Sequence, residues 1–175
     1  MNLWSEFVIW LTVTPRLKRL QRQFPEAEFY PFGSRYVCTP PALTTDVDFM
    51  VYSQEDITAK LVGYGYKKSE AFENCYSDVG GGNEFSSWRK GVVNLVLVST
   101  RSFLDKNITA THICKTKNLR RKYHRIVVYE ALRGNKTESL PDDFCPQLQS
   151  FLESLNGPHG HAIYMAYRIQ NGLVP

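Results

Sequence analysis

The chain has 175 residues, a net charge of +4, 43% hydrophobic residues and 22% charged residues. This length predicts a single domain over residues 1–175, and the ordinary charge content excludes an intrinsically disordered chain. The apolar run over residues 4–13 is too short to span a bilayer and lacks the features of a secretory signal, so we expect a cytoplasmic protein without a membrane segment. Four cysteines lie far apart in the sequence, which favours reduced thiols over disulfides or a zinc site.

The N-terminal residues predict two successive helices. Residues 4–13 favour a helix, although their β-branched side chains leave a strand open as an alternative. Thr14 as the N-cap and Pro15 in the first turn predict the start of a second helix, which Pro25 ends.

The later elements alternate between strands and helices. They are, in order, a strand at 29–32, a turn at 33–34, a strand at 46–51, a helix at 54–62, a strand at 66–72, a glycine-rich loop at 78–84, strands at 85–90 and 92–99, a turn at 102–105, two helices separated around 116–119, and helices at 147–155 and 161–169. The strand at 92–99 is apolar on both faces, so we expect it at the centre of the sheet. This order predicts an α/β (α+β) fold, with a mixed β-sheet and flanking helices in a core at 14–99 and a helical part at 106–175.

Two aspartates at the strand 46–51 form the first candidate site. Side chains alternate along a strand, so Asp46 and Asp48 point to one face about 6.5–7 Å apart, while the apolar residues between them point to a core. Two carboxylates this close favour a bound divalent cation, which is typical of phosphoryl-transfer chemistry. The backbone N–H groups of the Gly33–Ser34 turn suit a phosphate. The alternative is a strand that carries two exposed aspartates on its solvent face.

A Gly-Ser turn, a spacer and Asp-Xaa-Asp in a strand resemble the signature of the nucleotidyltransferase superfamily that includes DNA polymerase beta. The resemblance covers about residues 14–99 and implies a nucleotidyltransferase-like fold. It implies that Gly33 and Ser34 hold the triphosphate of an NTP, and that Asp46 and Asp48 hold Mg²⁺ or Mn²⁺. The short chain is similar to minimal members of the superfamily, which are encoded by phages or belong to toxin–antitoxin systems.

Asn94 stands where the resemblance places a third carboxylate, on the strand beside the Asp-Xaa-Asp strand. An amide oxygen can ligate Mg²⁺, but it brings no negative charge and cannot act as a base. A buried amide also costs about 1–3 kcal/mol unless its hydrogen bonds are met, so we expect Asn94 to have a partner. Asp105 and Glu84 are alternative sources of the missing carboxylate, and Arg35 in the turn is a further candidate for a phosphate contact.

A basic segment follows the predicted sheet. No carboxylate occurs between Lys106 and Tyr129. The candidate anion-binding and RNA-binding residues in this segment are Lys115, Lys117, Arg120, Arg121 and Lys122. A cluster of one sign repels itself unless an anion is near, and a triphosphate or an RNA backbone would supply one. The alternative is a solvated helix face.

These features predict a metal-dependent enzyme, a nucleotidyltransferase that transfers a nucleoside monophosphate from an NTP to a hydroxyl acceptor. RNA, and tRNA in particular, is the expected acceptor. The alternative, which Asn94 motivates, is a catalytically degenerate protein of the same fold that binds nucleotide, RNA or a protein partner without transfer.

Overall fold

A computed structural model describes residues 3–69, 85–133 and 144–174. The chain divides into two compact units, Met1–Leu104 and Asp105–Pro175. The boundary falls between the core expected at 14–99 and the helical part expected at 106–175. We refer to these as unit 1 and unit 2.

Unit 1 is built on a five-stranded mixed sheet, as the sequence predicts, with the strand order β1-β2-β5-β4-β3. The strands are β1 (Ala27–Phe32), β2 (Val47–Ser53), β3 (Lys67–Lys68), β4 (Phe85–Lys90) and β5 (Val93–Val98). β2 and β5 run parallel, and the other neighbouring pairs are antiparallel. β5 occupies the centre, which explains why its sequence is apolar on both faces and confirms the expectation for 92–99.

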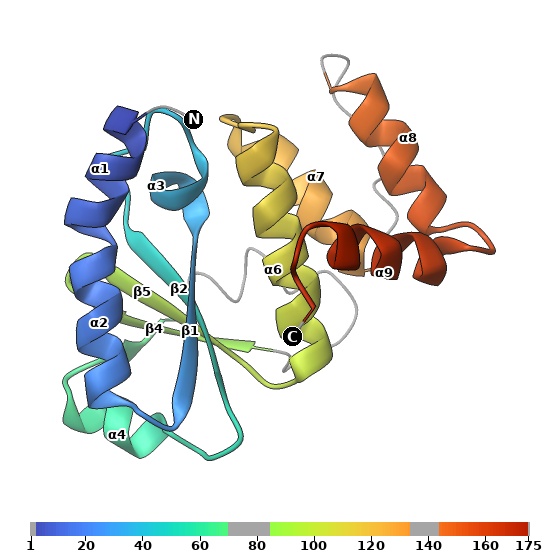
Figure 1. Ribbon diagram of the computed structural model, residues 1–175. Helices are drawn as coiled ribbons and strands as arrows, with labels where there is room; N and C mark the ends of the chain where they lie inside the picture. The colour runs from blue at the N-terminus through green and yellow to red at the C-terminus, as the bar shows by residue number, and fades with distance from the viewer. Residues whose placement is uncertain (1–2, 70–84, 134–143, 175) are drawn as a thin grey trace. The chain divides into compact units, whose positions relative to one another are not determined.

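Two N-terminal helices, α1 (Leu3–Thr12) and α2 (Thr14–Gln23), run along the sheet (Figure 1). Leu20 of α2 and Phe24, the C-cap residue of this helix, are both buried in the core with Phe49 of β2 and Leu95 of β5. The N-cap residue of α2 is Val13 and not Thr14 as predicted, so the helix begins one residue earlier than expected, at Thr14.

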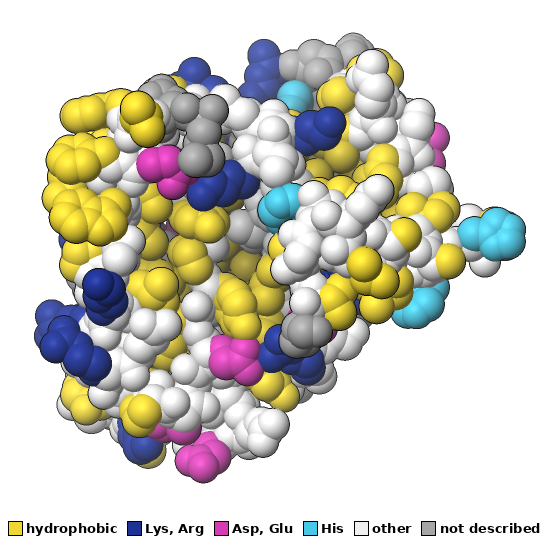
Figure 2. All heavy atoms as spheres, in the orientation of Figure 1, with side chains coloured by type: hydrophobic (Ala, Val, Ile, Leu, Met, Phe, Trp, Pro, Cys, Tyr) yellow, Lys and Arg dark blue, Asp and Glu magenta, His cyan; other side chains and the backbone are white. Residues whose placement is uncertain are grey.

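α1 presents an apolar face to solvent. Trp4, Phe7 and Trp10 are 61%, 49% and 58% exposed, and their rings follow one another at centroid distances of 6.1 and 6.2 Å. Figure 2 shows this face as a continuous group of hydrophobic side chains. The opposite side of α1 contributes Ile9 to the core.

Two short helices of unit 1 differ from the sequence prediction. The expected turn at 33–34 is the first turn of α3 (Gly33–Val37). The helix expected at 54–62 is α4 (Thr58–Gly63), which starts late because the Asp56 carboxylate accepts the backbone N–H of Thr58 at 2.9 Å and holds a turn before it. β3 lies within the strand expected at 66–72, of which residues 70–72 fall outside the described residues. The glycine-rich loop expected at 78–84 also lies outside the described residues.

The turn expected at 102–105 is wrong, because these residues form the start of helix α6 (Arg101–Thr116). Thr100 precedes the helix, and its hydroxyl oxygen accepts the backbone N–H of Phe103 at 3.2 Å. This is the hydrogen bond of a helix N-cap, and it satisfies a donor that the first turn leaves open.

Unit 2 contains most of α6 with α7 (Lys122–Arg133), α8 (Pro146–Leu155) and α9 (Gly160–Gln170). The break between α6 and α7 lies where the sequence predicts it. Arg168 of α9 pairs with Asp105 of α6 at 3.1 Å, and Arg133 of α7 donates to the side-chain oxygen of Asn107 at 2.8 Å. Among the described residues, the structure contains no helix long and apolar enough to cross a bilayer.

Candidate functional site

Asp48 is the second residue of β2, and Asp46, expected as the first residue of the strand, lies directly before it at the end of the 38–46 loop. Val47, Phe49 and Val51 are buried in the core beneath α2, which confirms the predicted alternation along the strand. Asp48 therefore lies on the opposite face of the sheet, between Phe32 of β1 and Asn94 of β5 in the strand register.

Gly33 approaches the carboxylate of Asp48 very closely. A Cβ atom built on Gly33 would lie 2.1 Å from Asp48 Oδ2, and the φ angle of Gly33 is +75°. Both facts require glycine here, because other residues rarely adopt this backbone conformation and would overlap the carboxylate. The antiparallel pairing of β1 with β2, in which Phe32 lies opposite Asp48, brings the Gly-Ser turn beside the Asp-Xaa-Asp segment.

Asn94 has the hydrogen-bond partners that its burial demands. Its side-chain nitrogen donates to Asp48 Oδ1 at 3.0 Å, and its oxygen accepts the hydroxyl of Ser87 at 2.9 Å. Asn94 is 1% exposed and Ser87 0%. The orientation of the amide follows from chemistry, because an ionised carboxylate only accepts hydrogen bonds and must face the amide nitrogen. Asn94 therefore positions Asp48, and its oxygen is engaged by Ser87.

Arg89 is a site residue that the sequence analysis missed. Its guanidinium forms an ion pair with Asp46, and the two side chains are 47% and 37% exposed. Arg89 lies opposite Asn94 in the antiparallel pairing of β4 and β5, so alternation places it on the Asp48 face. Pairs this exposed contribute at most about 1 kcal/mol, so Asp46 can exchange this partner for another cation at small cost.

Arg35 holds the loop that carries Asp46. Its guanidinium donates to the backbone carbonyls of Leu43 and Thr45, and only 9% of the residue is exposed. Burial lowers the pKa of Arg35, and the neighbouring charge of Arg16 lowers it further. A phosphate contact by Arg35 stays a prediction, and it would require Arg35 to exchange these bonds.

Ser34 and Asp105 have partners that bear on their expected roles. The Ser34 hydroxyl donates to the hydroxyl oxygen of Thr45 at 3.1 Å, which joins α3 to the loop before β2. Asp105 belongs to unit 2 and pairs with Arg168, so the structure assigns its carboxylate a role inside the helical unit. Glu84 lies outside the described residues.

The donor set suits Mg²⁺ or Mn²⁺ in part. Mg²⁺ binds through one or two carboxylates and keeps water or substrate phosphates as its other ligands, which matches Asp46 and Asp48 as hard oxygen donors. Among the described residues there is no group of three or more metal-binding side chains. A substrate phosphate or water would therefore have to complete the coordination, and the metal site stays a prediction.

The metal site has a direct test in thermal melts. Binding to the native state alone adds about 2.7 kcal/mol of stability at a hundredfold excess over Kd, so millimolar Mn²⁺ should raise the melting temperature by several degrees. The double variant Asp46→Asn/Asp48→Asn should lose this shift. Equal shifts in the two proteins would mean that these carboxylates do not bind the metal.

The five basic residues of the helical segment gather at the α6–α7 junction. Lys115 lies in the last turn of α6, Lys122 begins α7, and Lys117, Arg120 and Arg121 lie exposed between them. The junction is held by buried Leu119 and by Arg125, which donates to the carbonyl of Leu119 at 2.9 Å. These five residues belong to unit 2, and they span the break between α6 and α7 instead of lying along one helix.

No family model matches this chain, and no curated protein matches it.

Proposed function

We propose that unit 1 is a nucleotidyltransferase-type domain that binds an NTP with Mg²⁺ and transfers its nucleoside monophosphate to a hydroxyl acceptor. The observation that carries this proposal is the approach of Gly33 to Asp48, where a Cβ would lie 2.1 Å from the carboxylate oxygen. It brings a turn with backbone donors and a carboxylate strand to one point, which is the arrangement that a metal-bound triphosphate needs.

Each residue of this site would have its own role in binding the NTP and the metal. Asp46 and Asp48 would hold the metal, which neutralises phosphate charge when it is bound. Asn94 would fix the rotamer of Asp48 through its 3.0 Å hydrogen bond. Gly33 and Ser34 would face the phosphates with their backbone N–H groups. Arg89 would release Asp46 and then stand beside the phosphates as a cation.

The test is transfer of label from NTPs to total tRNA with Mg²⁺. Asp48→Asn is the sharpest variant, because an amide oxygen in that place can still accept the hydrogen bond of Asn94 while the charge is lost. We expect it to abolish labelling, whereas Glu55→Ala, which removes an exposed carboxylate of the same unit, should label like the wild type. Equal labelling by Asp48→Asn would overturn the assignment.

A second candidate is a degenerate protein of this fold that binds nucleotide without transferring it. The observation in its favour is that Asn94 points its amide nitrogen at Asp48 and that Arg89 pairs with Asp46. In such a protein the amide of Asn94 would replace a catalytic carboxylate, and the guanidinium of Arg89 would replace the metal as the partner of Asp46. Binding of NTP by a wild type that labels no acceptor would favour this reading.

If the acceptor is RNA, the α6–α7 junction is the expected contact surface. Each neutralised phosphate of a single strand lowers log K by about 0.7 per unit of log salt. Three or four contacts would weaken binding about tenfold or more between about 50 and 200 mM salt. Arg120→Ala/Arg121→Ala should flatten the slope by about 1.4.

The matched control for that variant is Lys18→Ala/Arg22→Ala, which removes the same charge from α2 of unit 1. This control should leave the salt slope as it is in the wild type. If Arg120→Ala/Arg121→Ala also leaves it unchanged, the junction is a solvated surface and the acceptor is a small hydroxyl compound or a protein.

A further inference from the structure

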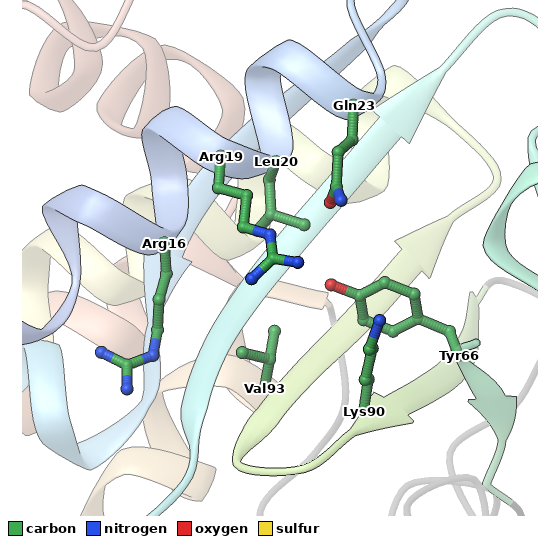
Figure 3. A pocket seen from close by; sticks show the side chains of 7 residues that line it. All are labelled: Arg16, Arg19, Leu20, Gln23, Tyr66, Lys90 and Val93. Carbon is green, nitrogen blue, oxygen red and sulfur yellow. The ribbon is translucent and has the colours of Figure 1, made fainter. Parts of the chain in front are cut away.

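A second polar site lies on the other face of the sheet, between α2 and the turn that joins β4 to β5 (Figure 3). It is a cavity of about 150 Å³. The residues that line it are Arg16, Arg19, Leu20, Gln23, Tyr66, Lys90 and Val93. Val93 pairs with Val47 of β2, whose side chain is in the core beneath α2, so this cavity and Asp48 lie on opposite faces.

The polar lining consists of hydrogen-bond donors and contains no carboxylate. Arg16, Arg19 and Lys90 each bring a positive charge, while Tyr66 and Gln23 add a hydroxyl and an amide. No carboxylate of the described residues forms an ion pair with any of the three cations. Like charges repel in such a cavity unless an anion compensates them.

The structure anchors two of these cations, Lys90 and Arg16. The Lys90 ammonium donates to the backbone carbonyl of Tyr64 at 2.6 Å and lies 5.9 Å from the ring centre of Tyr66. Arg16 is anchored on the backbone carbonyl of Thr12. Figure 3 shows Arg19 and Gln23 reaching from α2 toward the hydroxyl of Tyr66. Burial raises the pKa of Tyr66, which keeps its hydroxyl protonated as a donor at neutral pH.

We propose that this cavity binds a phosphate monoester group through Arg19, Lys90 and Tyr66, with Arg16 adding to the positive field. The cavity volume indicates the size of the ligand, because pockets for drug-sized ligands measure about 300 Å³ or more and this smaller cavity suits a group such as a single phosphate. The positive charge of the lining indicates the chemical class of the ligand. A phosphate monoester carries a charge of about −1.5 to −2 at pH 7, so it compensates three cations better than a singly charged carboxylate would.

The proposal is tested by calorimetric titration of the whole chain with inorganic phosphate at low salt, with EDTA present to exclude metal-bridged binding. We expect saturable binding that acetate at the same ionic strength does not reproduce. Arg19→Gln and Lys90→Gln should each weaken it about tenfold, since a charge-assisted hydrogen bond is lost.

Two controls separate this cavity from general charge and from the carboxylate site. Arg22→Gln removes an arginine of α2 that does not line the cavity, and it should bind phosphate like the wild type. Asp48→Asn should also bind phosphate normally, so a failed nucleotidyl-transfer assay leaves this result intact. The proposal is overturned by absent binding in the wild type, or by equal losses in Arg19→Gln and Arg22→Gln.

Two oligonucleotides identify the source of the phosphate. If a 5′-phosphorylated oligonucleotide binds more tightly than its 5′-hydroxyl counterpart, and Arg19→Gln removes the difference, the ligand is the end of a nucleic acid. If the two oligonucleotides bind equally while inorganic phosphate binds in an Arg19-dependent way, the ligand is a free small phosphate compound.

Discussion

Asn94→Asp is expected to lower the melting temperature of unit 1 by about 10 °C or more when EDTA is present. The substitution is nearly isosteric, but it replaces the amide nitrogen, now 3.0 Å from Asp48 Oδ1, with a carboxylate oxygen. Position 94 is 1% exposed, so the new carboxylate would be buried and would face the like charge of Asp48. Losing this buried donor and adding the repulsion should cost about 2–4 kcal/mol.

Proton uptake and metal binding should both relieve that cost. One of the two facing carboxylates can take up a proton in acid, so the difference from the wild type should be smaller at pH 5 than at pH 8. Mn²⁺ should restore more stability to Asn94→Asp than to the wild type, because the variant offers a third carboxylate. Gln21→Glu, an amide-to-acid change on the exposed side of α2, should show neither effect.

The transfer activity of Asn94→Asp separates the two candidate functions. If the variant gains or greatly raises activity, the wild type is a binding protein in which Asn94 has replaced a catalytic carboxylate. An unchanged activity would mean that another carboxylate already does this work. An Asn94→Asp variant as stable as the wild type in EDTA would contradict the hydrogen bond from Asn94 to Asp48.

Gly33→Ala is expected to remove about 2–5 kcal/mol of stability and the Mn²⁺ shift together. The added Cβ would lie 2.1 Å from Asp48 Oδ2, and alanine would have to adopt a φ angle of +75°. The backbone conformation alone costs about 1–2 kcal/mol. Displacing Asp48 would also leave the amide of Asn94 buried without its acceptor, which adds about 1–3 kcal/mol.

Alanine substitutions at two other glycines separate the cost of the backbone conformation from the cost of the contact with Asp48. Gly91 has a φ angle of +57° with nothing within 4 Å of an added Cβ, so Gly91→Ala reports the backbone cost alone. Gly63 has the same open space without the positive φ angle, and Gly63→Ala should be neutral or slightly stabilising. If Gly33→Ala melts at the temperature of Gly91→Ala, the contact with Asp48 carries no energy.

The sequence predicts the parts of the fold that depend on local periodicity. Alternation along β2 separates Asp48 from Val47 and Phe49, and the doubly apolar run of β5 places it at the sheet centre. The expectation that Asn94 needs a partner also follows from chemistry alone, although the identity of that partner does not.

The remaining features depend on pairings between distant segments. Arg89 reaches Asp46 because of the register of β4 on β5 and of β5 on β2, which no local pattern fixes. The loop bonds of Arg35 and the grouping of Arg19 with Lys90 likewise join residues from separate elements. The function predicted by the resemblance stays a prediction, since it depends on ligands and chemistry that the fold leaves open.

The positions of the tryptophans make the two units spectroscopically distinct. All three, Trp4, Trp10 and Trp88, belong to unit 1. Trp4 and Trp10 are exposed and should be quenched by acrylamide in the native protein, whereas Trp88 is 7% exposed and should be protected until unit 1 unfolds. Far-ultraviolet circular dichroism follows the helices of both units. Denaturation followed by fluorescence and by dichroism can therefore reveal, without any label, whether the helical unit unfolds with the sheet or separately from it.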